Sequence, residues 1–195
     1  AFNARHPGLY VSVTVANSRD TLRDLLDYRT DVAVLAHVDP DPRLVAIPYR
    51  RHRVVAFCHV DHPFARRRGI RARDMEGQRL IVREAGSTTR LAFEQAMTQA
   101  GVRPKVVMEI GSRESIREAV AKGIGLGVVS EAEFIPDPRI RALPVTDAEI
   151  YTYAHVVHLR ERQNARLVRA FLDVLAGLLP VGSPSSRRRP SSSRR

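Results

Sequence analysis

Apolar residues follow two patterns that alternate along this chain. Segments in which apolar and polar residues alternate, or in which apolar residues run together, predict β-strands. The segment "YVSVTVA" at residues 10–16 is a clear alternating example. The predicted strands cover residues 10–16, 31–37, 44–49, 53–60, 79–84, 105–110, 124–130 and 149–159, and a further short strand falls within residues 134–145.

Between the predicted strands, apolar residues recur every three or four positions, which predicts helices. Residues that can cap a helix N-terminus precede each helical pattern. These caps are Asn17 or Ser18, the cluster from Gly86 to Thr89, Ser112, and Asn164. Gly101 and Gly123 follow two of the patterns, where a left-handed residue commonly ends a helix.

Strands that alternate with helices predict an α/β protein. The strands at residues 10–16 and 31–37 flank a helix, so we expect them to be parallel. Two long non-helical stretches divide the chain into two lobes, and the long strands at residues 53–60 and 151–159 would cross between them. We expect residues 1–57 and 156–181 to form lobe I, with the C-terminal helix packed on it, and residues 58–155 to form lobe II.

The charge of the chain is strongly basic and comes almost entirely from arginine. The net charge is +11, and the Ser/Pro/Arg tail at residues 182–195 supplies five of the arginines and no acid. A tail without apolar residues cannot bury a core, so we expect it to be disordered. It could contact nucleic-acid phosphates without specificity, although basic runs often lack any such role.

Other bulk features limit the class of protein. No apolar run approaches the roughly 18 residues of a membrane span, and the N-terminus lacks a signal-peptide pattern. The single cysteine, Cys58, excludes an internal disulfide and fits a reducing cytoplasm. We therefore expect a cytoplasmic protein without a membrane partner.

The stretch "REAGSTTRLAFEQAM" places Ser87, Thr88 and Thr89 at the start of a helix. One hydroxyl is enough to cap a helix, where it contributes about 1 kcal/mol. A cluster of three could also hold a small anion, because helix N-termini offer free N–H groups and partial positive charge. Arg90 could either assist such an anion or lie on the solvent side of the helix.

Two more junctions repeat this arrangement of a strand end, a polar residue and a helix start. In open α/β sheets, ligands collect beyond the carboxyl ends of the strands, so the three junctions could share one cleft. Arg113 is unfavourable at a helix N-terminus, which makes a binding role more plausible there, although Glu114 could pair with it. The two additional junctions are Asn17–Ser18 and Ser112–Arg113.

Signals for catalysis or metal binding are weak. Two histidine pairs, His59 with His62 and His155 with His158, have metal-like spacing, but a three-residue separation in a strand points side chains to opposite faces. The glycines at 123, 125 and 127 follow a helix and enter a strand, the reverse of a nucleotide-binding loop. We therefore expect no metal, no cofactor and no catalytic residue.

The ordered set of motifs resembles the effector-binding domain of LysR-type transcriptional regulators. The matching segments are "FNARHPGLYVSVTVANSRDTLRDLLDYRTDVAVL", "VVAFCHVDHPFA", "REAGSTTRLAFEQAMTQAGVRP" and "EIGSRESIREAVAKGIGLGVVSE". The resemblance implies a two-lobed, type 2 periplasmic-binding-protein-like fold whose Rossmann-like lobes are joined by two crossover strands. It also implies that effectors bind between the lobes, and the residues it marks for effector binding are Asn17, Ser18, His59, Ser87, Thr88, Thr89, Ser112, Arg113 and Ser130.

The chain departs from the family pattern in three places. A glycine is usual near Thr30, and a proline often stands where this chain has Ser130. The family's effector domain begins with one further strand and helix, and whole regulators begin with a helix-turn-helix domain; of these we expect only the end of that helix to be present here. We therefore expect a truncated domain with unpaired ladder groups and low stability.

The resemblance implies a ligand-sensing module of a LysR-family regulator. Its effector would be a small organic anion, on the helix-terminus argument, and the module would form a homodimer or tetramer and reach DNA only through a missing N-terminal domain. A solute-binding protein of a transporter with the same fold is the alternative. A small enzyme is the least supported, because no catalytic set has a supporting motif.

Overall fold

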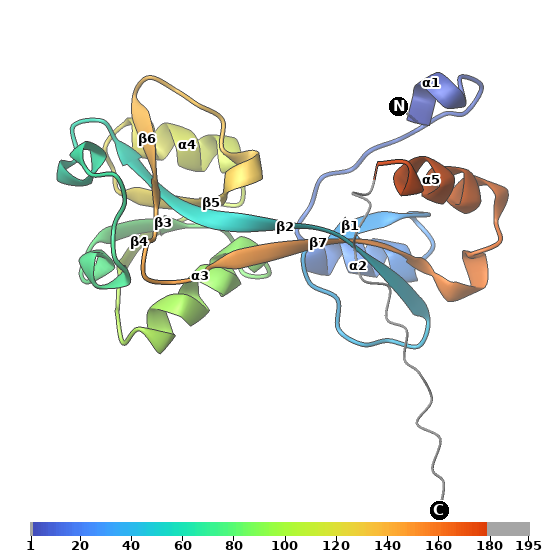
Figure 1. The fold of residues 1–195 in the computed structure, drawn as a ribbon, viewed down its shortest axis with the longest axis horizontal. Coiled ribbons are helices and arrows are strands. Elements are labelled where there is room, and N and C mark those ends of the chain that lie inside the picture. Colours follow the sequence, from blue (N-terminus) through green and yellow to red (C-terminus); the bar gives the residue numbers. More distant parts are fainter. Residues whose placement is uncertain (1, 179–195) are drawn as a thin grey trace, which may run out of the picture.

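Two long strands connect the two lobes of the molecule (Figure 1). This computed structural model describes residues 2–178, so the predicted tail at residues 182–195 lies outside the described part. The strand β2 (Leu44–His59) runs through both lobes, and β7 (Tyr151–Leu159) returns beside it. The prediction that these segments cross between lobes is confirmed, but the two strands predicted at residues 44–49 and 53–60 are one continuous strand.

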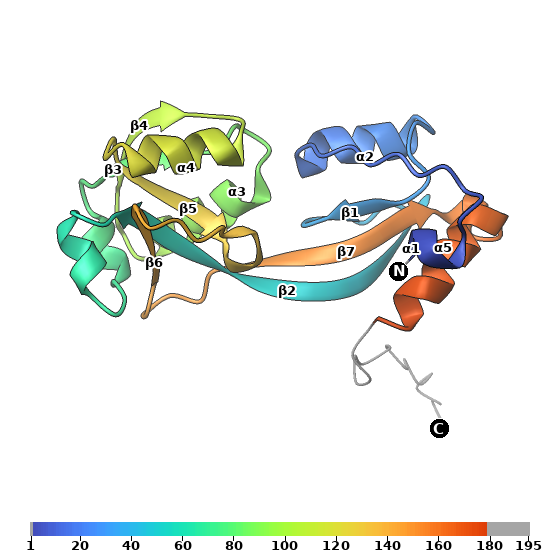
Figure 2. The same cartoon turned by 90° about the horizontal axis from the view of Figure 1, so that it is seen from above.

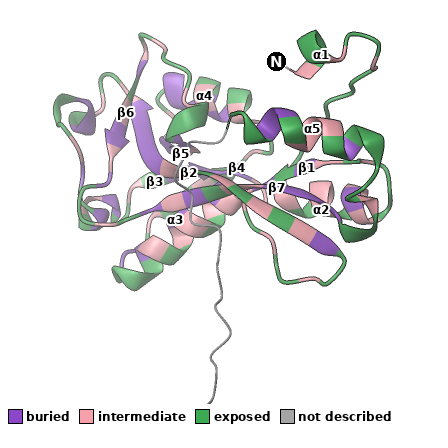
Figure 3. Cartoon of the chain, turned by 45° about the vertical axis from the view of Figure 1, so that its right-hand side comes forward, coloured by how far each residue is buried: buried purple, intermediate pink, exposed green. Residues whose placement is uncertain are grey.

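The hydrogen-bonded partners of β2 change where it passes from one lobe to the other. Residues 44–53 pair antiparallel with β7, and a bulge interrupts the register between Pro48 and Arg50. From Val54 onward, β2 pairs antiparallel with β5 (Leu126–Ser130) and β6 (Ile140–Pro144). The ladder therefore changes a few residues before the lobe boundary predicted at residue 57. Figure 3 shows the same change in burial, since β2 becomes fully buried as it enters lobe II.

Lobe II is a three-layer sandwich with helices on both faces of a mixed sheet. Its parallel strands are β3 (Arg79–Val82), β4 (Lys105–Glu109) and β5. One face packs against α3 (Thr88–Gln99) through Phe93 and Met97, and the other packs against α4 (Arg113–Ala121) through Ile116 and Val120. Burial on both faces explains why β3 and β5 are apolar runs rather than alternating segments, whereas β4 is a largely exposed edge strand. Short 3₁₀ turns lie at η1 (Pro63–Arg66), η2 (Ala72–Met75) and η3 (Glu131–Glu133).

Two glycines permit the close packing of lobe II. A Cβ at Gly125 would lie 2.7 Å from the carbonyl oxygen of Arg79, and a Cβ at Gly127 would lie 2.4 Å from the Phe57 ring. Neither space can hold a methyl group without displacement of its neighbours. Gly125 and Gly127 therefore serve the close packing of the strands of lobe II.

Lobe I contains α1 (Phe2–Arg5), α2 (Ser18–Leu26), β1 (Ala33–Leu35), η4 (Arg160–Arg162) and α5 (Arg166–Ala176). The strand β1 pairs antiparallel with β7, and α5 lies beside them in lobe I (Figure 1). The cap predicted at Asn164 is wrong, because α5 begins after Ala165 without a side-chain cap bond.

The strand predicted at residues 10–16 does not form. Tyr10 is 93% exposed, Val13 81% and Val15 78%, and the segment pairs with no strand among residues 2–178. An alternating sequence becomes a strand only where a neighbouring strand supplies hydrogen-bond partners. The parallel strand–helix–strand unit predicted for lobe I is therefore absent from the described residues, and Val34 of β1 is left 58% exposed.

Candidate ligand-binding cleft

A cleft of about 280 Å³ lies between the two lobes. The helices α2, α3 and α4 all lie on the same side of the crossing strands (Figure 2). Residues from five regions line the cleft: the helix starts, β1, the ends of β3 and β5, the η3 turn and the crossing strands. The polar members are Asn17, Ser18, Tyr49, His52, Arg83, Ser87, Thr88, Thr89, Arg113, Ser130, Glu133, Thr152 and Tyr153.

At the start of α2, both polar side chains are engaged with the backbone. The Asn17 Oδ1 atom accepts a hydrogen bond from the Asp20 N–H at 3.0 Å, which makes it the helix cap. The Ser18 hydroxyl accepts a hydrogen bond from the Ala36 N–H at 3.3 Å, and so connects α2 to the end of β1. These two residues shape the lobe I wall of the cleft.

At the start of α3, only one of the three hydroxyl groups acts as a cap. The Ser87 Oγ atom accepts a hydrogen bond from the Arg90 N–H at 3.4 Å. The hydroxyls of Thr88 and Thr89 make no hydrogen bond with any residue between 2 and 178, and Thr89 is only 8% exposed. Two hydroxyl donors thus line the cleft at a helix N-terminus without a protein partner among these residues, and helix N-termini favour negative charge.

Arg90 has a structural role and does not reach the cleft. Its guanidinium donates to Glu94 and Glu109, both at 2.7 Å, and to the Arg83 carbonyl at 2.8 Å. These bonds connect α3 to the neighbouring strands β3 and β4. Of the two possibilities that the sequence left open for Arg90, neither describes this position.

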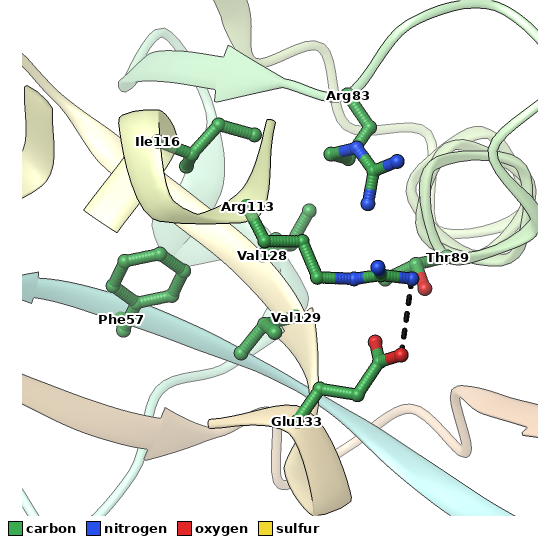
Figure 4. Close-up of a pocket in the computed structure, with 8 residues that line it drawn as sticks. All are labelled: Phe57, Arg83, Thr89, Arg113, Ile116, Val128, Val129 and Glu133. Carbon is green, nitrogen blue, oxygen red and sulfur yellow. Dashed lines mark ion pairs between the residues drawn. The ribbon is translucent and has the colours of Figure 1, made fainter. Parts of the chain in front are cut away.

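At the start of α4, Ser112 and Arg113 have separate roles. The Ser112 hydroxyl caps the helix by accepting from the Ser115 N–H at 3.2 Å, and it lies outside the cleft lining. The Arg113 side chain enters the cleft, where its Nη2 atom lies 3.0 Å from Oε1 of Glu133 (Figure 4). The ion pair of Arg113 is thus with Glu133, whereas the Glu114 carboxylate accepts a hydrogen bond from the Ser112 hydroxyl at 3.0 Å.

Arg83, at the end of β3, is a second arginine in the cleft lining and has no obvious sequence signal. It is 7% exposed and makes two hydrogen bonds to Glu84, at 2.7 and 2.8 Å. Burial alone would raise the pKa of Glu84, but hydrogen bonds that include those from Arg83 and Asn17 hold this pKa below its usual range. The Arg83–Glu84 pair is therefore charged and largely buried, with side chains that are 8% and 24% exposed.

The lobes are close together beside this ion pair. The Asn17 side chain, whose hydrogen bond lowers the pKa of Glu84, belongs to lobe I, whereas Glu84 belongs to lobe II. A Cβ at Gly86 would lie 3.6 Å from the guanidinium of Arg19 on α2. The cleft is therefore bounded on one side by contact between the start of α2 and the loop before α3.

The crossing strands supply cleft residues that no sequence motif marks. His52 of β2 and Thr152 of β7 are register partners, and Tyr153 follows directly. The register of β2 shifts at Tyr49, and such bulges commonly change the direction in which a side chain points. Tyr49 lines the cleft. The predicted contribution of the crossing strand was instead His59, which lies beside β6 and accepts from the Asp61 N–H at 3.2 Å. Of the predicted residues, His59 and Ser112 are outside the cleft.

The remaining chemistry of the described residues is modest. Among residues 2–178, no three side chains of histidine, cysteine, aspartate or glutamate gather closely enough to hold a metal ion. Cys58 is completely buried, and burial raises the pKa of its thiol to about 11. No helix in this part of the chain is long and apolar enough to cross a membrane.

Comparisons with known proteins agree with this fold. The family model described as "LysR substrate binding domain" matches residues 1–180, so the chain belongs to this family. It is 34% identical over 184 residues to the HTH-type transcriptional regulator CbbR of Xanthobacter flavus, covering 90% of this chain and 54% of that protein. It is 32% identical over 177 residues to the RuBisCO operon transcriptional regulator of Acidithiobacillus ferrooxidans, covering 89% and 57%.

Solved structures show the same two-lobed, type 2 periplasmic-binding-protein-like fold. The regulatory domain of CcmR from Synechocystis PCC6803, in complex with 2-PG, has a TM-score of 0.82 and 26% identity, covering 91% of this chain and 87% of that one. The effector-binding domain of QuiR in complex with shikimate has a TM-score of 0.81 at 16% identity, covering 91% and 86%, and supports the fold alone. The chain spans about half the length of the curated relatives that it matches.

Proposed function

We propose that this chain is the ligand-sensing part of a LysR-family transcriptional regulator and that its cleft binds a small organic anion. The observation that carries the proposal is the convergence of three helix starts on one cleft, where the Thr88 and Thr89 hydroxyls and the Arg113 guanidinium face the same space. Helix N-termini and a guanidinium both favour negative charge. The complex of the CcmR regulatory domain with 2-PG supports a ligand in a domain of this kind.

The binding residues would contribute in different ways. Thr88 and Thr89 would donate hydroxyl hydrogen bonds, and the free N–H groups at the start of α3 would add partial positive charge. Arg113 would supply the formal charge, while Asn17, Ser18, Ser87 and Ser130 would shape the walls. His52, Thr152 and Tyr153, on the crossing strands, would form the floor of the site.

Ligand binding would act by a shift between arrangements of the lobes. A ligand that contacts both walls binds one arrangement better than others, and it can shift the equilibrium only by that difference in affinity. The signal would reach DNA through a separate domain of a dimeric or tetrameric protein. The relatives described above are transcriptional regulators, which favours this assignment over a solute-binding protein of a transporter.

A thermal-shift screen tests the proposal. A ligand at 100 times its Kd stabilises the folded state by about 2.7 kcal/mol, which shifts Tm by several degrees in a protein of this size. Small mono- and dianionic acids, including 2-PG, should raise Tm, whereas their uncharged esters or amides should not. Equal shifts with charged and uncharged compounds would contradict an anion site, and no shift with any acid would contradict the proposed ligand class.

A further inference from the structure

The Arg113–Glu133 ion pair stands at the boundary between the cleft and two smaller cavities in lobe II. Both residues line the main cleft, and both also line each of the small cavities, of about 20 and 50 Å³. Phe57 and Val129 form apolar walls of both small cavities. Figure 4 shows the Arg113 side chain extended toward Glu133, with Thr89 beside its guanidinium.

The two arginines of the cleft hold their partners differently. Arg83 is bound to Glu84 by two hydrogen bonds, and the two side chains are 8% and 24% exposed. The Arg113–Glu133 pair has its closest contact at 3.0 Å, and its side chains are 36% and 41% exposed. A buried pair is costly to break because it leaves a buried charge without a partner, whereas an exposed pair contributes little net free energy. Arg113 is therefore the arginine that can exchange its partner.

The position of Glu133 makes it a competitor for any anion in the cleft. Its carboxylate occupies one side of the Arg113 guanidinium, and Thr89 lines the same small cavity as the pair. An anion held by the Thr88 and Thr89 hydroxyls would lie within reach of the same guanidinium. We infer that Glu133 is an internal counter-ion of Arg113 that the effector's anion displaces, an inference that rests on the proposed function.

Displacement of Glu133 would free one end of the η3 turn. At the other end of the same loop, Arg139 bonds to Glu118 of α4 at 2.8 and 3.1 Å and to Asp137 at 2.6 Å. The loop is thus attached to α4 by an ion pair at each end, and only the Glu133 end faces the cleft. Occupancy of the cleft is in this way coupled to the surface of lobe II.

The test uses isothermal titration of the purified protein with 2-PG and with inorganic phosphate. Glu133→Gln removes the competing charge and keeps the side-chain size, so it should bind these anions about five-fold more tightly. Glu131→Gln is the matched control, because Glu131 lies on the same turn, is exposed and makes no ion pair with residues 2–178. Glu131→Gln should change the affinity by less than about two-fold, because it removes the same charge but leaves the Arg113–Glu133 ion pair in place.

A double-mutant cycle completes the test. Arg113→Gln should weaken anion binding, and in that background Glu133→Gln should give no further gain, because the two residues act through one contact. If Glu133→Gln binds no more tightly than Glu131→Gln, the internal counter-ion is wrong although the anion site stands. If no variant binds either anion, the proposed anion site fails together with this inference. Glu133→Ala repeats the comparison should the glutamine variant be poorly folded.

Discussion

The cluster at the start of α3 gives a direct way to separate a cap from a binding group. Ser87 accepts a hydrogen bond from the Arg90 N–H, whereas the Thr89 hydroxyl has no partner among residues 2–178. Ser87→Ala should therefore destabilise the fold, and Thr89→Val should weaken ligand binding. The two substitutions are close in sequence and remove one hydroxyl each, so each serves as the control for the other.

The expected magnitudes differ between the two measurements. Loss of the Ser87 cap should cost about 1 kcal/mol, or roughly 2–4 °C in Tm for a protein of this size. Thr89→Val exchanges an unbonded hydroxyl for a methyl group at a site that is 8% exposed, so its stability should change by less than about 0.5 kcal/mol. A hydrogen bond to a charged ligand contributes about 1.5–3 kcal/mol, so the affinity should fall roughly 10- to 150-fold.

Urea denaturation measures the stabilities, and isothermal titration with 2-PG measures the affinities. Thr89→Ser keeps the hydroxyl and should retain most of the binding. The reasoning fails if Thr89→Val loses as much stability as Ser87→Ala and keeps wild-type affinity, because Thr89 would then serve the fold alone.

Three further predictions concern the rest of the molecule. Gly127→Ala should lose about 1–3 kcal/mol of stability in urea denaturation, because its Cβ would lie 2.4 Å from the Phe57 ring, and Phe57→Leu should recover part of the loss. Cys58 should react with a thiol reagent at pH 8 only as fast as the protein unfolds. Burial raises the pKa of the Cys58 thiol from about 9 to about 11, so the folded state favours the protonated thiol. The stability that this preference contributes is complete below pH 9 and is lost as the pH rises toward 11. Denaturation measured across that pH range should show the loss. In hydrogen exchange, the amides of residues 10–16 should exchange rapidly and those of β7 slowly, and protection of residues 10–16 would show that another strand pairs with them.

Local sequence signals predicted most of the fold, and they failed where the answer depends on distant partners. The helices α2, α3 and α4 follow caps and apolar periodicity that lie within the element itself. Residues 10–16 have an equally clear strand pattern, but no neighbouring strand completes their ladder. A strand is stabilised by its neighbours, and alternation along one segment cannot show whether they are present.

The same distinction explains the candidate site. A strand end followed by a polar residue and a helix start can be recognised in the sequence. This pattern predicts the cleft residues Ser87, Thr88, Thr89 and Arg113. The cleft residues of the crossing strands have no such signal, because they lie mid-strand where β2 changes partners. The sequence pattern predicts two strands where β2 is one. The predicted binding residue of this region was therefore His59, at the end of β2, and not Tyr49 or His52 in its middle.

A crystal structure of the protein with 2-PG, or with the acid that raises Tm most, would show directly whether the cleft binds an anion. We expect an anion in the cleft between the lobes, within hydrogen-bond distance of the Thr88 and Thr89 hydroxyls and of the Arg113 guanidinium. An anion bound elsewhere, or an empty cleft at saturating concentration, would contradict it.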